Sequence, residues 1–82
     1  MPYVKQEKRP HLDPLVDLMV ALDIKADGDL NYVLFKYARR IEPSYNRLKN
    51  YRAELHEAAA EIKRRMLDPY EDQKIIENGD VL

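Results

Sequence analysis

The residues best suited to chemistry are basic and aromatic side chains in the middle of the sequence. Between residues 36 and 52 there are six lysines and arginines against one glutamate, with tyrosines interleaved. Guanidinium groups bind phosphate oxygens in pairs, and a tyrosine ring can stack on a nucleobase. We therefore expect a binding site for an anionic, nucleotide-like small molecule. Its predicted residues are Tyr32, Lys36, Arg39, Arg40, Tyr45, Arg47, Tyr51 and Arg52.

The same basic segment also has an explanation that involves no ligand. Cations late in a helix stabilise the negative end of its dipole. Residues 11–30 carry five aspartates against one lysine, and residues 68–82 carry five carboxylates against one lysine, so the basic residues can pair with either segment. Nucleic acid is not expected as a partner, because the whole chain has 14 lysines and arginines against 15 aspartates and glutamates.

Two pairs of carboxylates give a different hypothesis. Glu54 and Glu57 form an E-x-x-E pair, and Glu77 and Asp80 form an E-x-x-D pair. This pattern resembles the magnesium-binding signature of all-α nucleotide pyrophosphatases, which implies a Mg²⁺-dependent hydrolase that uses Glu54, Glu57 and Glu61. The objection is local: a glycine between Glu77 and Asp80 should end the helix, so the two carboxylates need not share a face.

Other catalytic chemistry lacks the residues it needs. The sequence has no cysteine and no threonine, and its one serine, Ser44, is predicted to cap a helix. His11 and His56 are isolated from further ligands, whereas a zinc site needs about three that converge. We predict no catalytic residue, no metal and no cofactor, and an enzyme is not the expected class.

Four helical segments must position these residues, at about 13–24, 29–41, 44–67 and 69–78. Two glycines and the absence of alternating patterns favour an all-α fold. Before them, two prolines in residues 1–10 indicate an extended arm. Asp13 followed by Pro14 is typical of a helix start. Asp27 or Asp29 is expected to cap the second helix, after a break at Gly28.

The third segment is the longest, and Ser44 or Glu42 is expected to cap it. A tight turn before it predicts a helical hairpin between the second and third helices. The sequence Asp68-Pro69 predicts a new cap, with either a kink or a fresh short helix after it. Asn78-Gly79 is typical of a helix end. We expect one helical domain over residues 1–82.

Several short strings resemble a family of small uncharacterised prokaryotic and phage proteins. They are the opening Met1-Pro2-Tyr3-Val4-Lys5, the string Gly28-Asp29-Leu30-Asn31-Tyr32, and the C-terminal strings Pro69-Tyr70-Glu71-Asp72-Gln73-Lys74 and Glu77-Asn78-Gly79-Asp80-Val81. The resemblance implies a compact helical protein and contributes no chemistry, because the family has no established activity.

The apolar residues predict self-association. The first helix is apolar around most of its circumference, and the third carries an apolar seam for nearly three heptads. We expect a homo-oligomer, most simply a symmetric dimer of long helices; the alternative is a monomer whose C-terminal segment folds back over the seam. No apolar run is long enough to span a membrane, so a cytoplasmic protein is expected.

Together these observations favour a non-enzymatic helical binding protein. Its first predicted role is that of a phage-type sponge, which sequesters a nucleotide-like anion at the corner between the second and third helices. The alternative is an adaptor or inhibitor that binds another protein through the apolar first helix.

Overall fold

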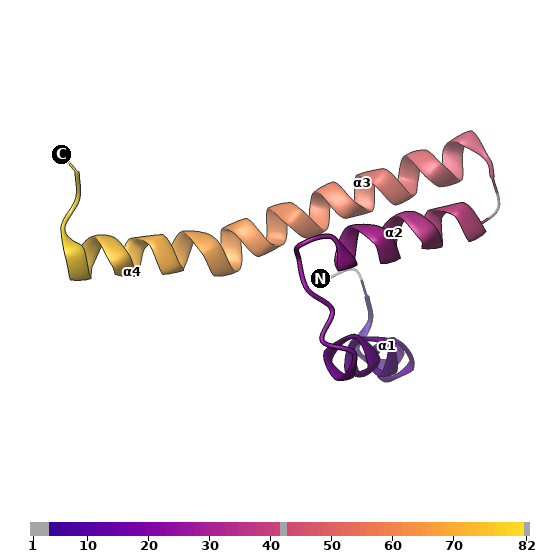
Figure 1. Ribbon diagram of the computed structural model, residues 1–82, viewed down its shortest axis with the longest axis horizontal. Helices are drawn as coiled ribbons and strands as arrows, with labels where there is room; N and C mark the ends of the chain where they lie inside the picture. The colour runs from indigo at the N-terminus through magenta and orange to yellow at the C-terminus, as the bar shows by residue number, and fades with distance from the viewer. Residues whose placement is uncertain (1–3, 42, 82) are drawn as a thin grey trace. The chain divides into compact units, whose positions relative to one another are not determined.

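The computed structural model describes residues 4–41 and 43–81, and all regular structure in these residues is helical (Figure 1). A 3₁₀ turn, Gln6–Lys8, leads into α1 (Arg9–Ala21), and α2 spans Asp29–Arg40. Then α3 (Tyr45–Ile62), a π-helical turn (Lys63–Leu67) and α4 (Asp68–Asn78) follow without a break. The all-α prediction is confirmed. The chain divides into two compact units, residues 1–42 and 43–82, and each is described by itself; the predicted hairpin and single domain remain predictions.

The first helix begins four residues earlier than predicted. Residues 6–8 form a turn and Arg9 opens α1, so the second half of the expected extended arm is helical. Pro10 lies in the first helical turn, where its missing N–H costs no hydrogen bond. Pro14 therefore lies inside α1, and Asp13 does not cap it. Residues 1–3 of the predicted arm lie outside the described residues.

The first helix also ends three residues earlier than predicted, at Ala21 rather than 24. Asp23 adopts φ of 53°, a left-handed conformation. The N–H of Asp23 donates to the carbonyl of Val20 over 3.0 Å, and that of Ile24 donates to the carbonyl of Met19 over 3.1 Å. This pair of bonds is a Schellman motif, which satisfies the last carbonyls of α1 and turns the chain away.

Glycine, rather than aspartate, occupies the cap position of α2. Gly28 has φ of 129° and no side chain forms a capping hydrogen bond. The prediction that Asp27 or Asp29 caps this helix was therefore wrong. Asp29 instead lies in the first turn, where its carboxylate accepts a hydrogen bond from the N–H of Lys25 over 3.4 Å. A carboxylate at this end is favourable for the helix dipole.

The cap of α3 is confirmed as Ser44, whose hydroxyl accepts a hydrogen bond from the N–H of Arg47 over 3.1 Å. The other candidate for this cap, Glu42, lies outside the described residues. At the other end of this unit, Gly79 with φ of 82° ends α4 after Asn78, as predicted.

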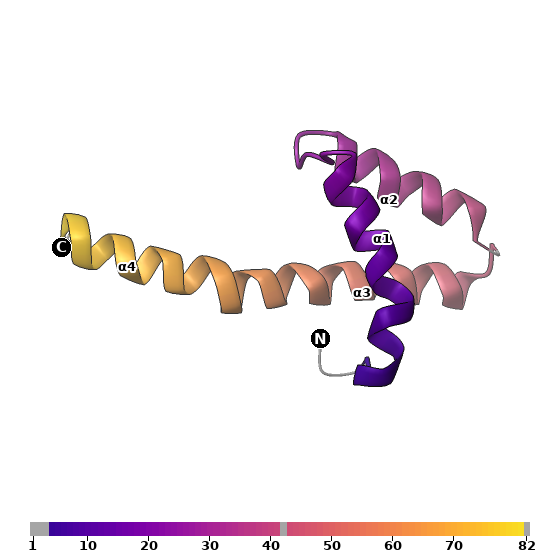
Figure 2. The ribbon, with the colours of Figure 1, turned by 90° about the horizontal axis from the view of Figure 1, so that it is seen from below.

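The predicted cap at Asp68 was wrong, because the helix continues through it. Leu67 and Asp68 both have right-handed helical backbone angles, and the carboxylate of Asp68 binds the ammonium of Lys63 over 3.0 Å instead. The π turn ends at Leu67, two residues before Pro69. A wider turn there accommodates the proline ring, which would otherwise clash with the carbonyl four residues earlier. Helices α3 and α4 thus run on as one rod (Figure 2).

Candidate functional site

One turn of α2 brings together an aromatic and a basic residue of the predicted site. The ammonium of Lys36 donates a hydrogen bond to the Tyr32 hydroxyl over 3.0 Å and lies 5.3 Å from the centre of the tyrosine ring. Their spacing of four residues places them on the same side of the helix. This pair is exposed to solvent and is therefore open to a ligand.

The hydrogen bond shifts the ionisation of both groups. It is the largest cause of a lowered pKa at Tyr32, and the positive charge of Lys36 adds to it. The same bond raises the pKa of Lys36. Lys36 therefore keeps its positive charge to higher pH than an isolated lysine.

A hollow of about 340 Å³ lies along this side of α2, lined by Tyr32, Val33, Lys36, Tyr37 and Arg40. Three of the eight predicted site residues are thus adjacent on one surface, which we call the α2 basic face and define by Tyr32, Lys36, Tyr37 and Arg40. Arg39, another of the predicted site residues on α2, does not line the hollow.

Tyr37 is the residue of this face that the sequence analysis missed. Its spacing on α2 is that of an apolar core residue, but its side chain is 58% exposed. The sequence held one signal, because Tyr37 lies three residues before Arg40. Residues three apart share a side of the helix.

The other predicted site residues lie on the first two turns of α3, in the second unit. Tyr45 has Lys49 beside it, with the ammonium 5.7 Å from the ring centre, and Arg52 lies a further turn along. Arg47 and Tyr51 are one turn apart on the same helix. These residues form a second basic and aromatic group on α3. That both groups form one site at the corner between the second and third helices stays a prediction.

Of the three glutamates in the hydrolase hypothesis, Glu61 is held by a neighbouring arginine. Both oxygens of Glu61 accept hydrogen bonds from Arg64, over 3.1 and 3.0 Å, and these bonds are the main cause of its lowered pKa. Asp80 follows the helix end at Gly79, so it does not share a helical face with Glu77. In residues 4–41 and 43–81 no three acidic or histidine side chains are grouped as a metal site would need.

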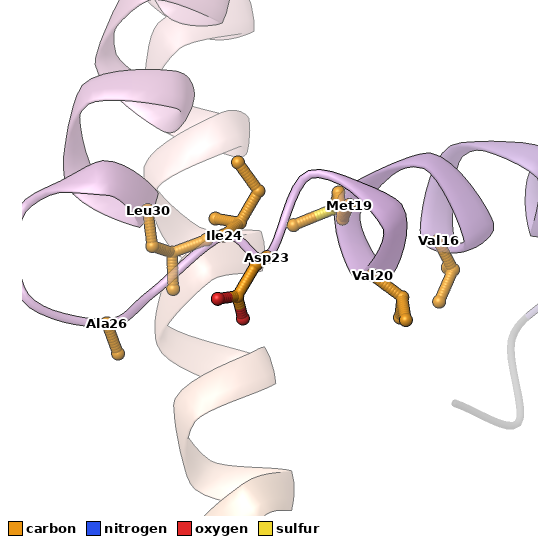
Figure 3. A pocket seen from close by; sticks show the side chains of 7 residues that line it. All are labelled: Val16, Met19, Val20, Asp23, Ile24, Ala26 and Leu30. Atoms are coloured by element: carbon orange, nitrogen blue, oxygen red, sulfur yellow. The ribbon is translucent and has the colours of Figure 1, made fainter.

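Apolar side chains are the other notable surface feature. Among the described residues none is buried, and the exposed side chains of α1 include Leu15, Leu18 and Val20, the last 74% exposed. At the end of α1 a hollow of about 440 Å³ opens (Figure 3), lined by Val16, Met19, Val20, Asp23, Ile24, Ala26 and Leu30. The apolar side chains of α1 are therefore available for contact with another molecule.

The fold and these surfaces define a small all-helical protein with exposed apolar faces and a basic, aromatic helix face. The chain belongs to a family defined by a domain of unknown function (DUF6899), whose model matches residues 1–81. Comparison with curated proteins and with solved structures gave no match. Every helix in the described part of the chain is too short or too polar to cross a membrane.

Proposed function

We propose that the protein is a non-enzymatic binding protein that holds a nucleotide-like anion on the α2 basic face. The observation that carries this proposal is the hollow beside the Tyr32–Lys36 pair, with Arg40 one turn further along. The lysine and arginine would bind phosphate oxygens, and a tyrosine ring would stack on the base. Sequestering the nucleotide without converting it, as a phage-type sponge does, is the biological role that this chemistry suits.

A separate group on α3, defined by Tyr45, Arg47 and Arg52, is the second part of the proposal. It lies at a helix start, where backbone N–H groups and the positive end of the dipole favour anions. A second ligand would bind there. Arg39 lies on α2 and would act as an outer cation of the α2 basic face, where it raises the local concentration of an anionic ligand.

The test removes the two cations of the α2 face. Lys36→Ala together with Arg40→Ala should weaken the binding of ATP or GTP at least about tenfold, since each charge-assisted hydrogen bond is worth roughly 1.5–3 kcal/mol. Isothermal titration calorimetry of the full chain measures this. Lys5→Ala with Lys8→Ala removes the same charge elsewhere and should leave the affinity nearly unchanged.

Two results would contradict this proposal. One is an equal loss of affinity in both double variants, because it would mean that only net charge matters. The other is no heat of binding at millimolar concentration with ATP, GTP or inorganic phosphate.

The exposed apolar surface of α1 favours a second candidate function, an adaptor or inhibitor that binds another protein. Here Leu18→Glu should abolish recovery of that protein from cells, because a buried charge without a partner is costly at an interface. His11→Glu adds the same charge on the same helix at a polar position. Equal recovery with both variants would count against this candidate.

A further inference from the structure

The long helix of the second unit carries an apolar row along one side. Its members follow each other at spacings of three and four residues, and most are substantially exposed: Ile62 is 50%, Met66 66% and Tyr70 61% exposed. We call this set the long-helix row. It consists of Leu48, Tyr51, Leu55, Ala58, Ile62, Met66 and Tyr70.

The π turn keeps the row straight. In an uninterrupted α-helix each step of four residues overshoots a full turn by about 40°, so Met66 and Tyr70 would drift away from the line of Ile62. A π turn takes up an extra residue and cancels this drift. The turn spans Lys63–Leu67, between Ile62 and Tyr70. The row therefore stays on one side from Leu48 to Tyr70.

The C-terminal segment does not cover this row. Helix α4 continues the direction of α3 instead of folding back, as Figures 1 and 2 both show. The alternative in which the end of the chain folds over the seam is therefore wrong for residues 68–78.

We infer that the row is covered by the same row of a second copy of this chain, with the two long helices antiparallel. The row extends eleven residues on either side of Ala59, to Leu48 and Tyr70. A two-fold axis at Ala59 therefore places each copy's Leu48 against the partner's Tyr70. The small side chains of Ala58 and Ala59 lie at the crossing point, where they allow close approach of the two backbones.

A hollow on the long helix fits this register. It measures about 320 Å³ and is lined by Glu61, Ile62, Arg65 and Met66. Leu55 lies four residues before Ala59, and the centre of the hollow lies between four and five residues after it. The axis at Ala59 thus seats Leu55 of each copy in the hollow of the other, as a knob in a hole.

Charge selects the antiparallel direction. In this register Glu54 lies near the partner's Arg65. The Arg65 guanidinium is 3.7 Å from the nearest Glu61 oxygen, whereas Arg64 holds that carboxylate at 3.0 Å, so Arg65 has donors to spare. A parallel pair in register would set each Arg65 beside the partner's Arg65, and like charges at an interface are unfavourable.

Single cysteines test the direction and the register, since the natural chain has none. Under mild oxidation, Ala59→Cys should form a disulfide-linked dimer, whereas Leu48→Cys alone should not. An equimolar mixture of Leu48→Cys and Tyr70→Cys chains should give a mixed disulfide. Self-linking of Leu48→Cys would overturn the antiparallel arrangement, and failure of Ala59→Cys to link would overturn the register.

A charge swap tests the same interface in solution. Glu54→Arg and Arg65→Glu should each raise the dimer dissociation constant about tenfold, and the double variant should recover most of the loss. Glu57→Arg makes the same charge change off the row and should have little effect. A full chain that stays monomeric at 100 µM, or a double variant no better than the single ones, would overturn the inference. It does not depend on the anion site, because no nucleotide is present in either experiment.

Discussion

Asp23 is the residue whose backbone conformation is least expected from its type. A non-glycine residue with positive φ costs about 1 kcal/mol, and its exposed ion pair with Lys25 offsets little of that. Asp23→Gly should therefore stabilise the protein by about 1 kcal/mol and raise Tm by roughly 4–8 °C at fixed protein concentration. Calorimetry measures this, and a lowered Tm would show that the Asp23 side chain matters more than its backbone.

Substitution of Gly28 is expected to have the opposite effect, a loss of stability. Its φ of 129° is strained for any residue with a side chain, although a Cβ there would meet no neighbouring atom. Gly28→Ala should therefore cost about 1–3 kcal/mol through the backbone alone. Urea unfolding measures the loss. The unfolding free energy of Gly79→Ala, a variant at a helix end with φ of 82°, serves as the comparison. An unchanged unfolding free energy in Gly28→Ala would contradict the observed turn.

The Tyr32–Lys36 hydrogen bond predicts a specific titration. Lys36 lowers the pKa of Tyr32, so the tyrosine should lose its proton at lower pH than an ordinary tyrosine. Lys36→Met should move the titration of Tyr32 upward, and Lys49→Met, which removes a lysine beside another tyrosine, should not. Carbon NMR of the tyrosine rings resolves the individual groups. An unchanged titration in Lys36→Met would mean that the bond is absent in solution.

Among the elements, the π turn has the clearest consequence for assembly. Pro69 lacks an N–H and its ring disfavours a normal turn before it, so Pro69→Ala should let the segment relax to α-helix. The row beyond Ile62 would then rotate out of line. We expect unchanged helix content by circular dichroism and a weaker dimer by sedimentation. An unchanged dimer would show that Met66 and Tyr70 take no part in it.

Much of the helical organisation could be predicted from local signals. Ser44 and Gly79 mark helix ends by their own chemistry, and the structure confirms both. The end of α1 could not be predicted, because nothing in the pattern says that Asp23 turns left-handed. Nor could the continuous helix at Asp68, because the sequence Asp68-Pro69 is equally compatible with a new start and with a widened turn.

The candidate site was likewise predictable in part from local spacing. Tyr32 and Lys36 are four residues apart, a spacing typical of side chains that contact on one side of a helix, and the two do contact. The exposure of Tyr37 could not be predicted, because periodicity identifies which residues share a side of the helix but not what covers that side. The relation between the α2 and α3 groups depends on contacts distant in sequence, which spacing alone does not encode.

For the molecule as a whole, the main fact is the contrast between an apolar composition and the exposure of the described residues. Apolar residues make up 45% of the chain, yet none of the described residues is buried. Folding that depends on a second copy should make stability depend on concentration. The Tm should therefore rise as protein concentration increases from 1 to 100 µM in scanning calorimetry, and a constant Tm would contradict this dependence.

Sedimentation equilibrium of the full chain tests the central claim most directly. The pairing of two long-helix rows predicts a mass of about 19 kDa at 100 µM, twice the chain mass of 9.7 kDa. It also predicts that the average mass falls toward that of the single chain on dilution. The Leu55→Glu variant should show the same fall, because its charge would have to enter the partner's hollow. A mass of 9.7 kDa throughout this concentration range would contradict it.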